Sequence, residues 1–218
     1  MTTTAISAEM VKKLRDQTGA GMMDCKTALT EIEKAGDSAT PAWLDNPDGV
    51  VKKRVAQTIG KLGENMAVPR FVRYARKGYV GQYIHMGGKI GVMVEFGGAT
   101  PEIAKRDEFQ TLVKEIAMQI AAASPSYPTR AAVPADVLEK EKSIYRAQME
   151  NSGKPANVID KIVEGKLGSY YAQVVLPDQP SIRDPKQTVK DVVAAVNTAV
   201  GGSVAVTRFA RLKVGETS

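Results

Sequence analysis

The stretch Tyr79–Phe96, YVGQYIHMGGKIGVMVEF, decides the fold. Two runs rich in valine, isoleucine and tyrosine flank Met86-Gly87-Gly88-Lys89, and a glycine-containing turn between such runs is the usual signal of a β-hairpin. We therefore predict two antiparallel strands joined at this turn. His85, the only histidine of the chain, ends the first strand and lies beside the turn.

Helical and extended patterns follow this hairpin. Apolar residues at helical spacing predict helices over 103–123 and 188–200, and short strands are expected over 173–176 and 203–214. Residues 124–134 carry three prolines and form a predicted loop. Helices beside an antiparallel sheet are typical of the α+β class, which we predict for this region.

Two amphipathic helices are predicted within this region, over 135–151 and 155–171. Only Ser152-Gly153-Lys154-Pro155 joins them, and helices with so short a connection pack antiparallel. We predict a helical hairpin over 135–171 that projects from the core. Its apolar stripes either close on each other or offer a docking surface to a partner.

The residues before the β-hairpin form a predicted helical module. Helices are expected over 7–17 and 22–35, separated by glycines, and a third short helix follows them. Asn46-Pro47-Asp48-Gly49 is a turn and the best candidate for a linker. The expected domains are therefore a three-helix module, residues 1–48, and an α+β core, residues 49–218.

A basic helix over 51–62 and a strand over 66–74 are predicted between the module and the β-hairpin. Residues 67–73, AVPRFVR, match residues 205–211, AVTRFAR, at five of seven positions. Either these are two strands of one sheet, with arginines and aromatic residues at repeated places, or the likeness is a coincidence of short strands.

Composition limits the class of protein. The 218 residues are 43% hydrophobic and 25% charged with a net charge of +6, which is ordinary for a globular protein and compatible with an acidic partner. Cys25 is the only cysteine, so no disulfide forms within the chain and a reducing compartment, the cytoplasm, is expected. The first ten residues lack the pattern of a signal peptide, and no apolar run is long enough to span a membrane.

The sequence carries no motif of a catalytic site. Neither G-x-x-x-x-G-K-[ST] nor G-x-G-x-x-G is present, so no phosphate-binding loop is evident. One cysteine and one histidine are too few for a Cys/His metal site, and Cys25 is expected to be a buried structural residue. We therefore expect no enzyme activity, no metal and no cofactor. His85 is open to two interpretations, a solvated residue or a contact to a partner.

Residues 52–77 hold most of the excess positive charge. The basic residues stand against a single acid, Glu64, and are Lys52, Lys53, Arg54, Lys61, Arg70, Arg73, Arg76 and Lys77. With tyrosines and a phenylalanine nearby, such a segment can bind RNA through phosphate contacts and base stacking. The other interpretation is a solvated helix face followed by alternating strand residues.

The stretch Thr18–Leu29, TGAGMMDCKTAL, resembles the signature of bacterial elongation factor Ts. The resemblance extends over nearly the whole chain, and the further matching segments are residues 63–65, 78–94, 116–118, 137–147, 152–155, 163–166 and 179–180.

This resemblance implies guanine-nucleotide exchange on elongation factor Tu, without bond chemistry, membrane attachment or direct nucleic-acid binding. The N-terminal module would be of the ubiquitin-associated type and dock on the partner's GTPase domain. The implied contact residues are Arg15, Met22, Met23 and Lys26, and one of the two methionines is expected to pack in the module's own core. His85 matches a family histidine that packs against the partner.

The resemblance implies a mechanism of negative coupling, in which nucleotide affinity falls because the partner's Mg²⁺ site and phosphate loop are disturbed. Members usually carry a T-D-F-V-A motif whose Asp-Phe pair reaches the Mg²⁺ site. This chain has Thr100-Pro101-Glu102-Ile103-Ala104 instead, and the first of two core copies found in longer members is missing or reduced. The alternative function is therefore an elongation factor Tu-binding or RNA- or ribosome-binding protein with weak exchange.

Overall fold

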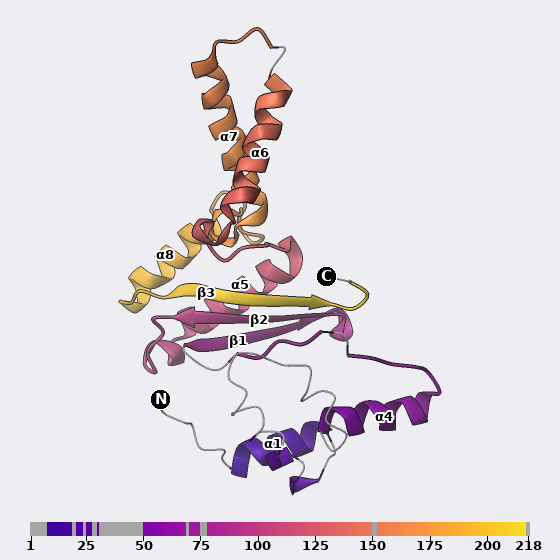
Figure 1. Ribbon diagram of the computed structural model, residues 1–218. Coiled ribbons are helices and arrows are strands. Elements are labelled where there is room, and N and C mark those ends of the chain that lie inside the picture. The colour runs from indigo at the N-terminus through magenta and orange to yellow at the C-terminus, as the bar shows by residue number, and fades with distance from the viewer. Residues whose placement is uncertain are drawn as a thin grey trace. The chain divides into compact units, whose positions relative to one another are not determined.

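The computed structural model describes residues 8–18, 21–23, 25–27, 30, 50–68, 70–74, 78–149 and 152–216. The chain divides into two compact units, Met1–Arg76 and Lys77–Ser218, and each is described by itself (Figure 1). The linker predicted near residue 48 lies outside the described residues, so the division into residues 1–48 and 49–218 stays a prediction.

Helices α1 (Ala8–Thr18) and α4 (Val50–Leu62) are the longest elements among the described residues of the first unit. A further helical turn begins after Gly21, whose carbonyl accepts the amide N–H of Cys25 at 3.0 Å. This start agrees with the helix predicted from residue 22. Most of that helix and the whole of the third one lie outside the described residues, so the three-helix, ubiquitin-associated-like module stays a prediction.

The strand predicted over residues 66–74 is wrong. Residues 66–68 and 70–74 form neither helix nor strand. A strand needs a neighbour for its backbone N–H and C=O groups, and the described residues of the first unit contain no strand that could provide one. Of the two similar stretches, only residues 205–211 are extended in a sheet, so the likeness does not mark two strands of one sheet.

The second unit contains a three-stranded antiparallel sheet in the order β1-β2-β3. Strands β1 (Tyr79–His85) and β2 (Ile90–Gly97) form the predicted hairpin, with Tyr79 opposite Phe96 and His85 opposite Ile90. Strand β3 (Ala205–Lys213) pairs with the other edge of β2. The predicted α+β class is thus confirmed for this unit.

Two helices, α5 (Asp107–Ala123) and α8 (Val189–Val200), complete the core of this unit. The helix predicted over 103–123 begins later than expected, because Arg106 is extended (ψ 135°) and separates α5 from a short 3-10 turn, Ile103–Lys105. Side chains from β2 and α5 interlock in the core: Val92, Val94, Phe96, Phe109, Leu112, Ile116 and Ile120 are all buried.

Helices α6 (Ala135–Met149) and α7 (Ala156–Val174) run side by side and extend away from the sheet (Figure 1). We call this pair the arm. Helix α7 continues to Val174, so the short strand predicted over 173–176 is wrong. The two β-branched residues Val174 and Val175 end a helix instead, and Val175 makes only a single bridge to Tyr127.

Two glycines allow a matched test of this packing. A Cβ on Gly81 would lie 2.3 Å from Cγ1 of Val113, whereas a Cβ on Gly168, within α7, would meet nothing within 4 Å. Gly81→Ala should therefore destabilise the protein by about 1–3 kcal/mol through overpacking. Gly168→Ala should stabilise it by about 0.5–1 kcal/mol, because alanine loses less backbone entropy in a helix. Denaturant unfolding of the full chain measures both, and a loss of stability in Gly168→Ala would contradict the open surroundings of α7.

Candidate partner-binding surfaces

His85 lies in the hairpin tip, which we define as residues Ile84–Gly88. Its Nδ1 is 2.8 Å from the Tyr83 hydroxyl, and the two rings stack at a centroid distance of 5.7 Å. Met86, Gly87 and Gly88 all have positive φ (51°, 64° and 94°), a conformation that L side chains rarely adopt. The pairing with Tyr83 and this tight turn hold the imidazole on an exposed tip.

The hairpin tip also exposes apolar surface that the sequence analysis did not single out. Ile84 is 66% exposed and Met86 is 61% exposed. The strand alternation could have indicated Ile84, because Gly81 and Tyr83 pack on the core side of β1 and Ile84 therefore lies on the other face. Exposed apolar side chains on a projecting turn are typical of a surface that contacts another protein.

The implied contact residues of the first unit are exposed. Met22 is 46% and Met23 is 72% exposed, so the expectation that one of them packs in the module's own core is wrong. Both methionines lie in the first helical turn after Gly21, and Cys25, three positions after Met22, is buried. Arg15, in the last turn of α1, and Lys26 are exposed as well.

The degenerate counterpart of the T-D-F motif forms a turn, which we call the Thr100 turn (Thr100–Ile103). The Thr100 hydroxyl accepts the amide N–H of Ile103 at 3.3 Å, and the Thr100 carbonyl accepts that of Ala104 at 2.8 Å. Ile103 is buried, whereas Thr100, Pro101 and Glu102 are exposed. The turn is therefore anchored by Ile103 and presents Pro101 and Glu102 to solvent.

Hydrogen bonds favour the ionised form of Glu102 in the Thr100 turn. A bond from the backbone N–H of Glu102 and a second one with the Thr100 side chain lower the pKa of the Glu102 carboxyl below its ordinary value. This turn and the hairpin tip lie at opposite ends of β2, which spans about 24 Å at the usual rise of a strand. The structure therefore does not bring His85 and Glu102 into one site.

The basic segment 52–77 is uneven in its exposure. Arg54 and Lys61 of α4 are exposed, but Lys53, Arg70 and Arg73 are partly buried, and Arg76 and Lys77 lie outside the described residues. Nη1 of Arg73 is buried without a hydrogen-bond partner. Partly buried guanidinium groups reach phosphates poorly, so the cationic surface is concentrated on α4.

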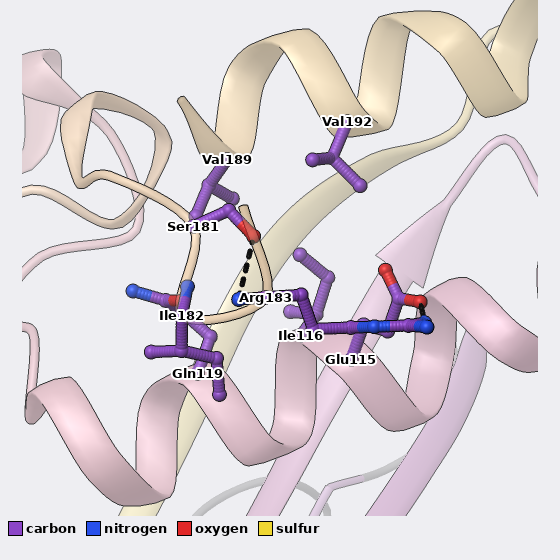
Figure 2. Close-up of a pocket in the computed structure, with 8 residues that line it drawn as sticks. All are labelled: Glu115, Ile116, Gln119, Ser181, Ile182, Arg183, Val189 and Val192. Carbon is purple, nitrogen blue, oxygen red and sulfur yellow. Dashed lines mark hydrogen bonds and ion pairs between the residues drawn. The ribbon is translucent and has the colours of Figure 1, made fainter. Parts of the chain in front are cut away.

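The second unit has a shallow pocket between α5, the loop 181–183 and α8 (Figure 2). Figure 2 shows Arg183 reaching across it to Glu115, with which it forms an ion pair, while the Ser181 hydroxyl accepts the Arg183 amide at 3.2 Å. The empty volume of the pocket is about 230 Å³ even when the open solvent at its mouth is included, and this is below the usual volume of a ligand site. We assign this pocket to structure and not to ligand binding.

The residues described by the structure offer no group of three or more His, Cys, Asp or Glu side chains that could hold a metal ion. Within the same residues, no helix combines the length and apolarity needed to cross a membrane.

Comparison with known proteins gives a consistent result. The family described as Elongation factor TS matches residues 12–216. Elongation factor Ts of Pseudothermotoga lettingae is 46% identical over 211 residues, which cover 97% of this chain and 98% of the relative. Elongation factor Ts of Caldanaerobacter subterraneus subsp. tengcongensis is 47% identical over 215 residues, which cover 97% of this chain and 98% of the relative. Elongation factor Ts of Geobacter sulfurreducens is 44% identical over 212 residues, which cover 97% of this chain and 91% of the relative. The short length of this chain is therefore shared with proteins of that name.

The electrostatics of the Thr100 turn can be tested by one substitution. Thr100→Val removes the hydroxyl and keeps the shape, so the pKa of Glu102 should rise toward its ordinary value while the bond from its own N–H keeps it below that value. NMR titration of the Glu102 carboxyl measures this shift. Thr58→Val in α4, whose hydroxyl donates to the Arg54 carbonyl, is the control and should leave Glu102 unchanged. An unmoved pKa in Thr100→Val would contradict the contact.

Proposed function

Because the chain belongs to the elongation factor Ts family of translation factors, we propose that it binds elongation factor Tu and accelerates the release of GDP from it. The observation that carries this proposal is the exposure of both Met22 and Met23 within the stretch that bears the family signature. The protein would act in the cytoplasm, where translation takes place, and would itself make and break no covalent bond.

Methionines suit this role because their side chains are flexible and polarizable and adapt to a partner's surface. Interfaces depend on a few apolar anchors that become fully buried, with charged residues around them. Met22 and Met23 provide such anchors, and the exposed Arg15 and Lys26 provide charges on the same unit. We propose these four residues as the contact to the GTPase domain of the partner.

His85 is proposed as a second contact, on the other unit. The hairpin tip is held by the Tyr83–His85 pair, and the neighbouring residues Ile84 and Met86 are exposed. A firm apolar tip can be docked at low cost in conformational entropy. In this proposal the imidazole acts by contact and not as an acid or a base.

Exchange would follow from coupling between two ligands of the partner. If this protein binds the partner better without nucleotide than with it, nucleotide affinity must fall by the same factor, and typical coupling energies are about 1–3 kcal/mol. In this proposal Pro101 and the ionised Glu102 of the Thr100 turn stand in for the acid and the aromatic ring of the T-D-F-V-A motif. Proline is too small to replace that ring, so we propose that the Mg²⁺ site is disturbed mainly through docking of the two units.

A second candidate function is RNA or ribosome binding with weak exchange. Helix α4 favours it, since Lys52, Lys53, Arg54 and Lys61 are accompanied by no acidic residue. Binding of this kind would weaken steeply and log-linearly with salt. Contact with elongation factor Tu through methionines would depend far less on salt, so a titration at two ionic strengths separates the candidates.

Release of fluorescent GDP from elongation factor Tu tests the main proposal. The unmodified protein should accelerate release. Met22→Ala with Met23→Ala should weaken binding at least tenfold, because loss of central anchors costs about 2 kcal/mol or more. The matched control is Leu62→Ala, which removes an equally exposed apolar residue of the same unit outside the signature. If the double variant binds as well as the control, the methionines are not the anchors.

The Thr100 turn offers a test by gain of function. Pro101→Asp combined with Glu102→Phe restores the acid and the ring, and should accelerate GDP release several-fold, within the range of about 1–3 kcal/mol that coupling energies span. Binding to nucleotide-free partner should change little. Stopped-flow fluorescence measures the rate, and an unchanged or slower release would show that this turn does not face the Mg²⁺ site.

A further inference from the structure

The base of the arm is attached to the core through the end of α7. The last carbonyls of a helix have no partner within the helix, and here other segments supply them. The Val174 carbonyl accepts the amides of Ser126 and Tyr127 at 2.8 and 2.9 Å, and the Gln173 carbonyl accepts the Gln179 side-chain amide at 2.8 Å. Val175 and Leu176, which follow α7, are completely buried. The end of α7 is therefore fixed in the core.

A buried amide network continues this attachment into α5. Gln119 donates to the Gln179 side chain at 3.1 Å and to the Pro180 carbonyl at 3.2 Å, and its oxygen accepts the Ile182 amide at 2.8 Å. Gln119 and Gln179 are almost completely buried. The chain that leaves α7 is thus held against α5.

The start of α6 is attached less firmly. Val133, two residues before it, is buried, but helix α6 itself contains no buried residue, and the Leu138 amide donates to the Pro134 carbonyl at 3.2 Å within the same segment. In α7 only Val163 and Leu167 are buried, and Gly165 and Gly168 have open space at their Cβ positions. Packing along the arm is therefore light, and its angle depends on contacts at the base.

Arg130 is the side chain that joins the two halves of the base. It lies in the short 3-10 segment that precedes α6 (Arg130–Ala132). Its Nε and Nη2 donate to the two Asp178 carboxylate oxygens at 2.9 and 2.7 Å, just beyond α7. Its guanidinium also lies 4.7 Å from the centre of the Tyr171 ring, in the last turn of α7. Because the planar guanidinium of Arg130 contacts both Asp178 and Tyr171, it fixes the orientation of the segment before α6 relative to α7 as well as the distance between them.

We propose that Arg130 is a positioning residue that sets the angle between the arm and the core, and that this angle is needed for efficient docking on elongation factor Tu. The second half of this inference rests on the proposed function. Backbone bonds hold the end of α7, but without Arg130 the start of α6 loses its fork to Asp178 and keeps the buried Val133 as its anchor, so the arm can tilt at its base. If the partner binds only one arm angle, a smaller fraction of the molecules is then able to bind it.

Pulsed electron paramagnetic resonance tests the first half without any partner. Spin labels are attached at Lys154→Cys, in the turn at the far end of the arm, and at Lys190→Cys, in α8, with Cys25→Ala in the background; both lysines are exposed. Arg130→Gln should broaden the distribution of label distances clearly. Arg130→Lys, which keeps the charge but not the fork, should give an intermediate width.

The matched control is Arg146→Gln, which removes an ion pair between the two helices of the arm, Arg146 to Asp160 at 3.2 Å, away from the base. It should leave the distribution as in the unmodified protein. An Arg130→Gln distribution as narrow as that of the control overturns the proposal. Circular dichroism checks that helix content is equal in all variants, so that broadening is not a sign of unfolding.

GDP release tests the second half. If the competent fraction falls to about one third in Arg130→Gln, the concentration for half-maximal stimulation should rise about threefold while the maximal rate is kept. A broadened distribution with unchanged half-saturation overturns the link to docking. If the unmodified protein does not accelerate GDP release at all, the proposed function fails, and the distance measurement still decides the role of Arg130.

Discussion

The contact between Phe96 and Phe109 is the interaction on which the second unit depends. Their rings meet edge to face with centroids 5.5 Å apart, and Tyr79 also meets Phe109 edge to face, at 5.0 Å. Edge-to-face pairs add about 0.5–1.5 kcal/mol to the burial of the rings themselves. Together the two contacts join α5 to both strands of the hairpin and fix the Phe96 end of β2 relative to α5.

The two candidate contact regions of this unit are placed by that sheet. The hairpin tip lies at one end of β2 and the Thr100 turn beyond the other, so their separation is set by a rigid strand. Each is held by its own local bonds, the first by Tyr83 and the second by the buried Ile103 and the Thr100 hydroxyl. A protein that acts by coupling has to resist deformation when its partner changes shape, and such an arrangement meets that need.

Local signals in the sequence predicted much of this architecture. Paired glycines between β-branched runs identified the hairpin, and helical spacing identified α5, α8 and the arm. The two strand predictions that failed had a common cause: residues 66–74 and 173–176 have strand-like composition, but composition does not reveal whether a neighbouring strand exists. The family signature identified Met22 and Met23, yet not that both are exposed. Arg130 and Asp178 are 48 positions apart, so no local pattern could pair them.

Among the described residues, the arm is bonded to the rest of the second unit only at its base, and its far end is the turn Ser152–Pro155. Length can therefore change there without disturbance of the core. Insertion or deletion of matched helical turns on both sides of this turn would alter how far the arm reaches and leave the sheet, the hairpin tip and the Thr100 turn in place. Evolution can thus adjust the reach of this protein separately from its stability, and relatives of different length can retain the same core.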